Sequence, residues 1–209
     1  MITASDHPVF TPLMRCYMDW RIRRSFHRIL FEGECVVASD APLLLLANHV
    51  GWWDGFWIER LVRYRFRRNL RVMMGHEALS ANRMLRYMGG FSGGTGVGDR
   101  RAMLRYAIGE LANPANALLL FPQGAFYSLY EEQVFFKPGA AYLIGRSERT
   151  PVVVFIALMM EYGPKPRPTV YLYCETYAGH NPATPEFRQA YGDFFARVGR
   201  EHRQKMSGQ

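Results

Sequence analysis

Short apolar runs, separated by turns and helical segments, constrain this fold more than any other feature of the chain. Three of them have the length of a β-strand: Leu43–Ala47, Ala117–Phe121 and Pro151–Leu158. A helix that crosses a bilayer needs about 18 to 20 apolar residues, and no run in the sequence approaches that length. These runs therefore predict strands of a globular core, with no membrane-spanning segment.

Segments with helical character alternate with these strands. We expect further strands at Gly33–Ala38, Leu70–Met74 and Val170–Glu175, and we extend the first run to Pro42–Ala47. Helices are predicted from Asp54 to about Tyr64 and from Phe136–Gly139 through about Ser147, and also over Glu77–Met88, Asp99–Leu111 and Pro185–Arg203. This alternation predicts a single α/β domain with a mixed, largely parallel sheet flanked by helices.

The N-terminal segment differs from the rest in its arginine content. Residues 11–31 carry apolar side chains with arginines between them, which predicts a basic amphipathic helix. We therefore treat residues 1–32 as an N-terminal helical region and residues 33–209 as the main domain. The apolar arc is broad enough for the helix both to pack on the domain and to contact lipid.

The net charge of +8 indicates an anionic partner. Arginines concentrate between residues 15 and 28 and again between residues 60 and 71, and aromatic side chains lie among them. Nucleic acid, an acidic lipid surface and an acidic carrier protein all suit such clusters. Aromatic flanks favour an anionic membrane surface, so we expect no nucleic acid partner, although composition alone leaves RNA open.

Cysteine usage and the N-terminus bear on location. The three cysteines are far apart and have no Cys-x-x-Cys spacing, which disfavours disulfides and structural zinc. Met1–Pro12 carries Asp6 and lacks a secretory signal pattern. We expect a cytoplasmic protein, peripherally associated with the inner face of the membrane.

The segment from Asn48 to Asp54 carries the clearest chemical signal. His49 follows the apolar run, and Asp54 lies five residues later, where a helix is predicted to begin. A histidine oriented by a carboxylate is suited to general base catalysis. Spacing alone is weak support, because His27 and Glu32 also satisfy a His-x4-acid pattern inside the predicted N-terminal helix.

Residues 89–98 form a glycine-rich stretch before a predicted helix. A dinucleotide-binding loop has a related composition, but here the glycine spacing is imperfect and the preceding element is predicted to be helical. We interpret the stretch as a mobile loop beside a substrate, and we expect neither a cofactor nor a metal ion.

Four motifs in order give a resemblance to the glycerolipid acyltransferases, the group that includes lysophosphatidic acid acyltransferase. Asn48, His49 and Asp54 match Asn-His-x4-Asp, and Phe121–Phe126 partly match Phe-Pro-Glu-Gly-Thr-Arg. Phe136–Ala140 match Phe-Lys-x-Gly-Ala, and Pro151–Val154 match an apolar strand that begins at a proline. The resemblance spans about residues 33 to 160, so residues 33–209 become the expected acyltransferase domain.

The resemblance implies transfer of an acyl group from acyl-CoA or acyl carrier protein to a hydroxyl of a lipid. His49 is then the predicted base that removes the hydroxyl proton, and Asp54 orients its ring. The expected substrate-binding residues are Asn48, Arg100, Arg101, Phe121, Pro122, Gln123, Gly124, Lys137 and Gly139. Asp54 is equally compatible with a helix cap, and Lys137 with an ordinary surface lysine.

Departures from the family pattern bear on the acceptor. Gln123 replaces a glutamate, and Ala125-Phe126 replaces a Thr-Arg pair, so one guanidinium that could bind phosphate is absent. We therefore predict a neutral or bulky hydroxylated acceptor, such as a glycolipid or carotenoid glycoside, or another lysophospholipid.

The alternative is a catalytically silent lipid- or RNA-binding protein on the same fold. A serine hydrolase is disfavoured because the chain has no Gly-x-Ser-x-Gly motif.

Overall fold

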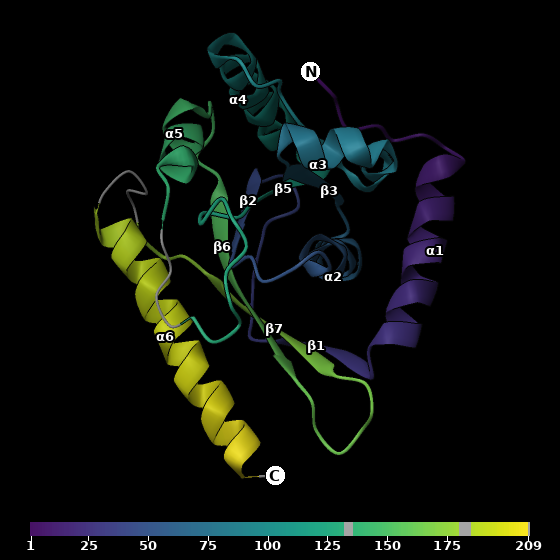
Figure 1. Cartoon of the computed structure of the whole chain (residues 1–209). Helices are drawn as coiled ribbons and strands as arrows, with labels where there is room; N and C mark the ends of the chain where they lie inside the picture. The colour runs from purple at the N-terminus through teal and green to yellow at the C-terminus, as the bar shows by residue number, and fades with distance from the viewer. Residues whose placement is uncertain (132–135, 180–184, 209) are drawn as a thin grey trace.

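The computed structural model describes residues 1–131, 136–179 and 185–208. A seven-stranded sheet lies at the centre of the molecule, with strand order β1-β7-β6-β2-β5-β3-β4 (Figure 1). The strands are β1 (Arg28–Glu32), β2 (Leu43–Ala47), β3 (Asn69–Met73), β4 (Gly90–Phe91), β5 (Asn116–Leu120), β6 (Val152–Glu161) and β7 (Thr169–Thr176). Every neighbouring pair is parallel except β6 and β7, which are antiparallel. The predicted α/β domain with a mixed, largely parallel sheet is confirmed.

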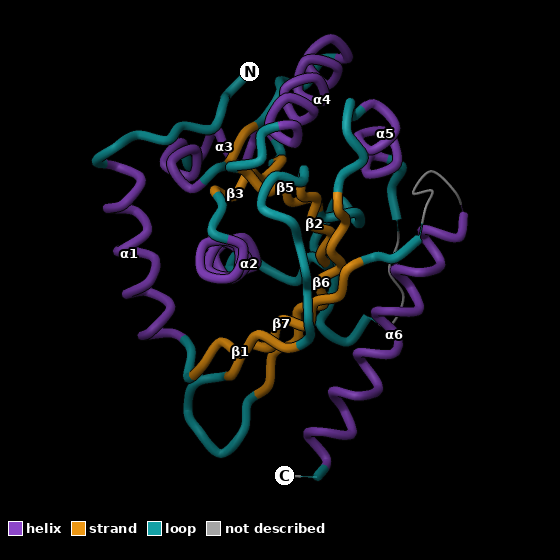
Figure 2. The backbone as a smooth tube through the Cα atoms, turned by 180° about the vertical axis from the view of Figure 1, so that it is seen from behind, coloured by secondary structure: helices purple, strands orange, loops and turns teal. Residues whose placement is uncertain are grey.

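Helices cover both faces of the sheet (Figure 2). The elements on the first face are α1 (Phe10–Ser25), α2 (Asp54–Leu61) with the π-helical turn η1 (Val62–Phe66), α3 (His76–Ala81) and the 3₁₀ helix η2 (Arg83–Met88). Those on the second face are α4 (Val97–Ala112), α5 (Gly139–Arg146) and α6 (Pro185–Ser207). None of the described helices is both long and apolar enough to cross a membrane.

The central strand β2 shows why the apolar runs form this sheet. Leu43, Leu45 and Ala47 join the core cluster under α1 and α2, whereas Leu44 and Leu46 join the cluster under α4, α5 and α6. Successive side chains of a strand point to opposite faces, so a strand covered on both sides must be apolar at every position. All five residues of β2 are fully buried.

The N-terminal helix is shorter than predicted. α1 ends at Ser25, Phe26 adopts an extended conformation, and residues 28–32 form the edge strand β1 beside β7. The predicted strand at Gly33–Ala38 is wrong, because β1 ends before it. Gly33 has a φ of +90°, and a side chain there would collide with the carbonyl oxygen of Cys174. Residues 28–32 thus join the sheet of the main domain, and the division at residue 32 stays a prediction.

The sequence predicts one helix over Glu77–Met88, whereas the structure has two shorter helices, α3 and η2. Asn82 leaves helical geometry with φ −134° and ψ 74°, and the chain continues as the 3₁₀ helix η2. The glycine-rich stretch contributes the short strand β4 and then the start of α4 at Val97.

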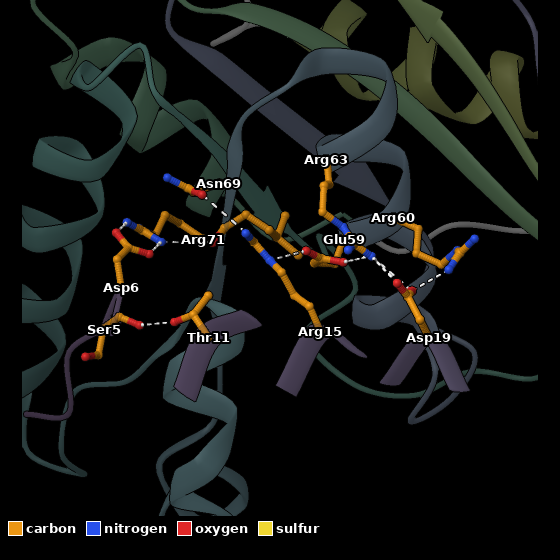
Figure 3. Close-up of polar contacts among 11 residues, drawn as sticks. Ser5, Asp6, Thr11, Arg15, Asp19, Glu59, Arg60, Arg63, Asn69 and Arg71 are labelled. Carbon is orange, nitrogen blue, oxygen red and sulfur yellow. Dashed lines mark hydrogen bonds and ion pairs between the residues drawn. The ribbon is translucent and has the colours of Figure 1, made fainter. Parts of the chain in front are cut away.

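Much of the second arginine cluster is paired inside the protein (Figure 3). Arg60 and Arg63 form ion pairs with Asp19 of α1, and Glu59 bridges Arg63 to Arg15 at 3.3 and 2.9 Å. Arg68 and Arg71 are buried as well, with Arg68 donating to loop carbonyls and Arg71 held between Asp6 and Glu110. Arg60, Arg63 and Arg71 fasten α1 and the N-terminal segment to the domain, and Arg68 holds the loop that precedes β2, so these four arginines are not free to meet an anionic partner.

Burial and pairing act against each other at Glu59. Burial raises the pKa of this carboxyl, and the guanidinium groups of Arg63 and Arg15 partly offset the rise. The ion pairs of this network join α1 to α2 and to the turn that follows it.

Candidate active site

His49 and Asp54 form a pair at the carboxyl end of β2. Nδ1 of His49 lies 2.8 Å from Oδ2 of Asp54, which is the first residue of α2. The Asp54 side chain is fully buried, whereas the His49 side chain keeps 20% of its surface exposed. In open parallel sheets, ligands bind beyond the carboxyl ends of the strands, which is where this pair lies.

Asp54 also organises the turn between the two residues. Its Oδ2 accepts hydrogen bonds from the backbone N–H groups of Val50 at 2.7 Å and Gly51 at 3.0 Å. An ionised carboxylate only accepts hydrogen bonds, so the proton between the two side chains belongs to Nδ1 of His49. Nε2 then carries the free lone pair that a general base requires. The same oxygen of Asp54 therefore both holds the turn and orients the imidazole.

Asn48 fixes the direction in which the chain leaves β2. Its side-chain amide donates to the carbonyl oxygen of Leu158 at 3.1 Å, and its Oδ1 accepts from the Leu158 N–H at 2.7 Å. Asn48 is buried, and both ends of its amide are satisfied by the backbone of β6. In this structure Asn48 positions His49, and its predicted contact with substrate stays a prediction.

Gln123 connects the third sequence motif to the first. Its Oε1 accepts a hydrogen bond of 2.7 Å from the backbone N–H of His49, and its side chain is buried. Gly124 then turns the chain with a φ of +66°, and its N–H donates to the carbonyl oxygen of Phe121 at 3.0 Å. The segment 121–124 therefore lies directly against His49, as the aligned motifs require.

Two aromatic rings enclose the imidazole of His49. The Phe121 ring stacks on it with 3.9 Å between centroids and 12° between planes, and the Phe126 ring lies 4.1 Å away with a tilt of 43°. The next residue, Tyr127, donates its N–H to the carbonyl oxygen of His49 at 2.8 Å. From the sequence, Phe126 removes a guanidinium and adds apolar surface, but no spacing signal indicates that its ring would contact His49.

Lys137 joins the site through Gly124. Its N–H donates to the carbonyl oxygen of Pro122 at 2.8 Å, and a side chain built on Gly124 would lie 2.6 Å from its ammonium nitrogen. Glycine at position 124 thus leaves the space in which the Lys137 side chain lies. Gly139 begins α5 two residues later, so the N-terminus of that helix adjoins the same segment.

Arg100 and Arg101 lie apart from this network. Both are exposed in the first turns of α4, and within the described parts of the chain no hydrogen bond or ion pair links either to His49, Gln123 or Lys137. In residues 1–131, 136–179 and 185–208, no cluster of three or more histidine, cysteine or acidic side chains could hold a metal ion. The assembled candidate site therefore consists of the first and third motifs with Lys137.

The fold and this site define a class: an α/β protein that presents a histidine–aspartate pair beyond the carboxyl end of a central parallel strand. The chain belongs to the Acyltransferase family, whose sequence model matches residues 28–159. No curated protein sequence matches the chain at a significant level.

The fold is also similar to that of a solved structure, the 1-acyl-sn-glycerophosphate (LPA) acyltransferase PlsC from Thermotoga maritima. The TM-score is 0.59 at 18% sequence identity, over 91% of this chain and 79% of the PlsC chain. At that level of identity the comparison establishes a common fold. Membership of the family is what supports acyltransferase activity for this chain.

Proposed function

We propose that the protein is an O-acyltransferase that moves a fatty acyl group from acyl-CoA or acyl carrier protein to a hydroxyl of a lipid, with His49 as general base. One observation carries the proposal: the buried Asp54 carboxylate accepts a 2.8 Å hydrogen bond from Nδ1 of His49, whose side chain is 20% exposed, which leaves Nε2 to act on substrate. A hydroxyl is a poor nucleophile at neutral pH, so a base must take its proton as it attacks.

The reaction proceeds without a covalent enzyme intermediate. Nε2 of His49 takes the acceptor proton as the acceptor oxygen bonds to the thioester carbonyl carbon, and Asp54 stabilises the resulting imidazolium. The tetrahedral oxyanion then collapses, the carbon–sulfur bond breaks, and the imidazolium returns its proton to the thiolate that leaves. The products are the acylated lipid and the free thiol, and His49 regains its starting protonation state.

The acceptor in this proposal is a neutral or bulky hydroxylated lipid, such as a glycolipid or carotenoid glycoside. Phe126 is 63% exposed and lies against the imidazole, so it presents an apolar surface where the family pattern has an arginine. A phosphate beside the base would lose the bidentate partner that a guanidinium provides. A lysophospholipid remains the second acceptor class under test.

Lys137 and the start of α5 are the proposed contacts for a phosphate of the donor. The ammonium group lies beside Gly124, and the first turn of α5 presents backbone N–H groups next to the same segment. A helix N-terminus favours negative charge, and a lysine nearby adds to that preference. Both acyl-CoA and acyl carrier protein carry a phosphate on the arm that holds the thioester.

The proposal places the protein at an anionic membrane surface, on its cytoplasmic side. Along α1, Phe10, Leu13, Tyr17 and Trp20 are 41–59% exposed, and their spacing puts them on one side of the helix. Arg24 lies over the Trp20 ring at 5.4 Å, which combines a cation with an aromatic in the manner of interfacial helices. In this proposal the exposed face of α1 contacts the bilayer from which the lipid acceptor comes.

The alternative is a catalytically silent lipid- or RNA-binding protein. Its support is the neutral Gln123, which stands where the family pattern has a glutamate. In the structure, however, the Gln123 side chain binds the His49 backbone, a role that a neutral amide fulfils.

A single assay separates these possibilities. The purified protein is incubated with radiolabelled acyl-CoA or acyl carrier protein and a panel of neutral glycolipids, carotenoid glycosides and lysophospholipids. Acylated product that disappears in His49→Ala supports the enzyme. No turnover with any donor, together with retained liposome or RNA binding, would establish the silent binding protein. A clear preference for lysophosphatidic acid over all neutral acceptors would reject the proposed acceptor class.

A further inference from the structure

A cavity lined by basic side chains lies away from His49, where the C-terminal end of α1 meets β1. Its volume is about 190 Å³. At roughly 30 Å³ for each water molecule in the liquid, this equals on the order of six waters, which suits a headgroup and is too small for an acyl chain. In Figure 1 this junction lies at the lower end of α1, on the periphery of the molecule.

Basic side chains from three elements line this cavity. Arg23 comes from the last turn of α1, His27 from the bend before β1, Arg28 from the start of β1, and Arg60 from α2. Arg60 is paired with Asp19, whereas Arg23 and Arg28 are exposed and form no ion pair with any part of the chain that the structure describes. No described carboxylate lines the cavity. The positive charge of two guanidinium groups is therefore available to a ligand.

The floor of the cavity is apolar. Phe26 and Ile29 contribute to it, and Phe31 lines it while remaining 40% exposed on the edge strand. Phe26 itself packs edge-on against Trp53 and Trp57, with ring centroids 5.2 and 5.1 Å away. Since Trp53 directly precedes Asp54, the floor is continuous with the residues that begin α2.

Backbone contacts hold the junction in place. The Phe26 N–H donates to the carbonyl oxygen of Ile22 at 2.9 Å, and the His27 N–H donates to that of Pro168 at 2.8 Å. Arg167, from the connection between β6 and β7, donates to the carbonyl oxygen of Arg23. Hydrogen bonds thus connect α1, the residues before β1 and the connection between β6 and β7. The backbone that carries Arg23 and Arg28 is therefore held in place.

We infer that this cavity binds the phosphate-bearing headgroup of an anionic phospholipid, and so holds α1 on the membrane next to the acceptor. Guanidinium groups match the geometry of phosphate oxygens, and the apolar floor suits the glycerol and first methylenes of a lipid. The apolar side chains that line the cavity, with Phe31 still 40% exposed, favour a lipid over free phosphate. The inference rests on the proposed position at a membrane, and it does not depend on acyl transfer.

Calorimetric titration tests the site with soluble probes. The probes are dihexanoyl phosphatidylglycerol below its micelle concentration, dihexanoyl phosphatidylcholine and inorganic phosphate, at 0.15 M salt. We expect the anionic lipid to bind, the zwitterionic lipid to bind at least tenfold more weakly, and inorganic phosphate to bind more weakly than the anionic lipid. Equal affinities for inorganic phosphate and anionic lipid would overturn the inference in favour of a simple phosphate site.

Two variants and one matched control locate the binding. The double variant Arg23→Gln with Arg28→Gln is expected to lose about thirtyfold in affinity, since each basic side chain near an anionic surface is worth roughly fivefold. Phe31→Gln is expected to weaken the lipid and leave inorganic phosphate unchanged. Arg188→Gln with Arg200→Gln removes the same charge from exposed positions of α6 and is expected to change affinity less than about threefold, because salt screens charges that do not touch the ligand.

An equal loss in the α6 control would show that net charge alone is responsible and would refute the site. Equal melting temperatures confirm that every variant is folded. Acyl transfer to a soluble acceptor is measured in parallel: unchanged transfer with lost lipid binding separates this site from the catalytic one. Conversely, loss of acyl transfer in His49→Ala with anionic lipid binding retained would show that the catalytic site is not needed for lipid binding at the cavity.

Discussion

Oε1 of Gln123 accepts a 2.7 Å hydrogen bond from the backbone N–H of His49. The residue that holds the backbone of the proposed base is therefore one at which this chain departs from the family pattern. The family has a glutamate there. The amide keeps the acceptor oxygen and removes a negative charge from the immediate surroundings of the imidazole. The substitution therefore preserves the geometry of the site and changes its electrostatics.

Gln123→Glu is expected to shift the pH dependence of acyl transfer. A carboxylate next to His49 favours the imidazolium, so the acidic limb of the rate profile is expected to move to higher pH. The measurement is kcat/KM from pH 5 to 9, with Gln204→Glu on the exposed side of α6 as the control. An acidic limb that stays in place would mean that residue 123 does not act on the base.

His49→Ala is expected to reduce kcat/KM about a hundredfold to ten-thousandfold, the usual contribution of a positioned general base. His49 is partly exposed, so the variant should fold with an unchanged circular dichroism spectrum. His76→Ala on α3 is the control and should retain full activity. Activity above a tenth of the wild-type value in His49→Ala would remove this residue from its proposed role.

Two substitutions of Asp54 should separate orientation from capping. Asp54→Asn retains an acceptor for the Val50 and Gly51 N–H groups but no longer stabilises the imidazolium, so kcat should fall by about three to four orders of magnitude while KM changes little. Asp54→Ala also leaves the partly buried N–H groups of Val50 and Gly51 without a partner and should lower the free energy of unfolding by about 1–3 kcal/mol. Urea titration and steady-state kinetics measure the two effects. Equal stability of both variants would contradict the capping role.

The central part of the fold was predictable because its signal is local. β2 is apolar at every position, β5 at every position after Asn116, and β6 from Val152 to Met160, because helices cover both faces of the sheet, so these strands are visible in the sequence. His49 and Asp54 were predictable for a related reason: a strand end and a helix start five residues apart bring them within reach of one another. Their roles in catalysis stay predictions.

The edge of the sheet was not predictable from local pattern. Ile29, Leu30 and Phe31 fit a helical face as well as a strand, and the choice is made by β7, which lies about 140 residues further along the chain. The same holds for Phe126. Its contact with His49 depends on the left-handed turn at Gly124 and on the bond between Tyr127 and His49, neither of which has a spacing signature.

Phe126→Ala and Phe126→Arg test how this ring acts on acceptor choice. Removing the ring takes away a surface 4.1 Å from the imidazole, so we expect KM for a neutral lipid acceptor to rise about three- to tenfold. Phe126→Arg should improve kcat/KM for lysophosphatidic acid relative to the neutral acceptor by about tenfold or more, because a guanidinium binds phosphate. Tyr130→Ala, 92% exposed in the same segment, is the control. An unchanged acceptor ratio in Phe126→Arg would exclude this position as a determinant of specificity.

We expect the stability of the protein to depend on pH through the buried side chain of His202. It is a residue of α6, and its Nδ1 lies 2.9 Å from the Tyr173 hydroxyl and its Nε2 3.3 Å from Glu161, with the Tyr171 ring packed against it. Burial lowers its pKa below the ordinary value near 6.5, and Glu161 offsets part of that change, whereas the nearby charges of Lys205 and Arg203 lower it further.

Because the folded pKa is the lower one, the unfolded chain binds the proton more tightly. The stabilisation from neutral His202 is therefore complete above about pH 6.5 and is lost as the pH falls below that value. We expect the urea midpoint to decline between pH 7.5 and 5.5, and to decline less in His202→Gln, which keeps hydrogen-bonding groups and cannot titrate. His7→Gln near the N-terminus is the control, and it should follow the wild-type slope. The same slope in His202→Gln as in the wild type would mean that the acid sensitivity arises from other groups.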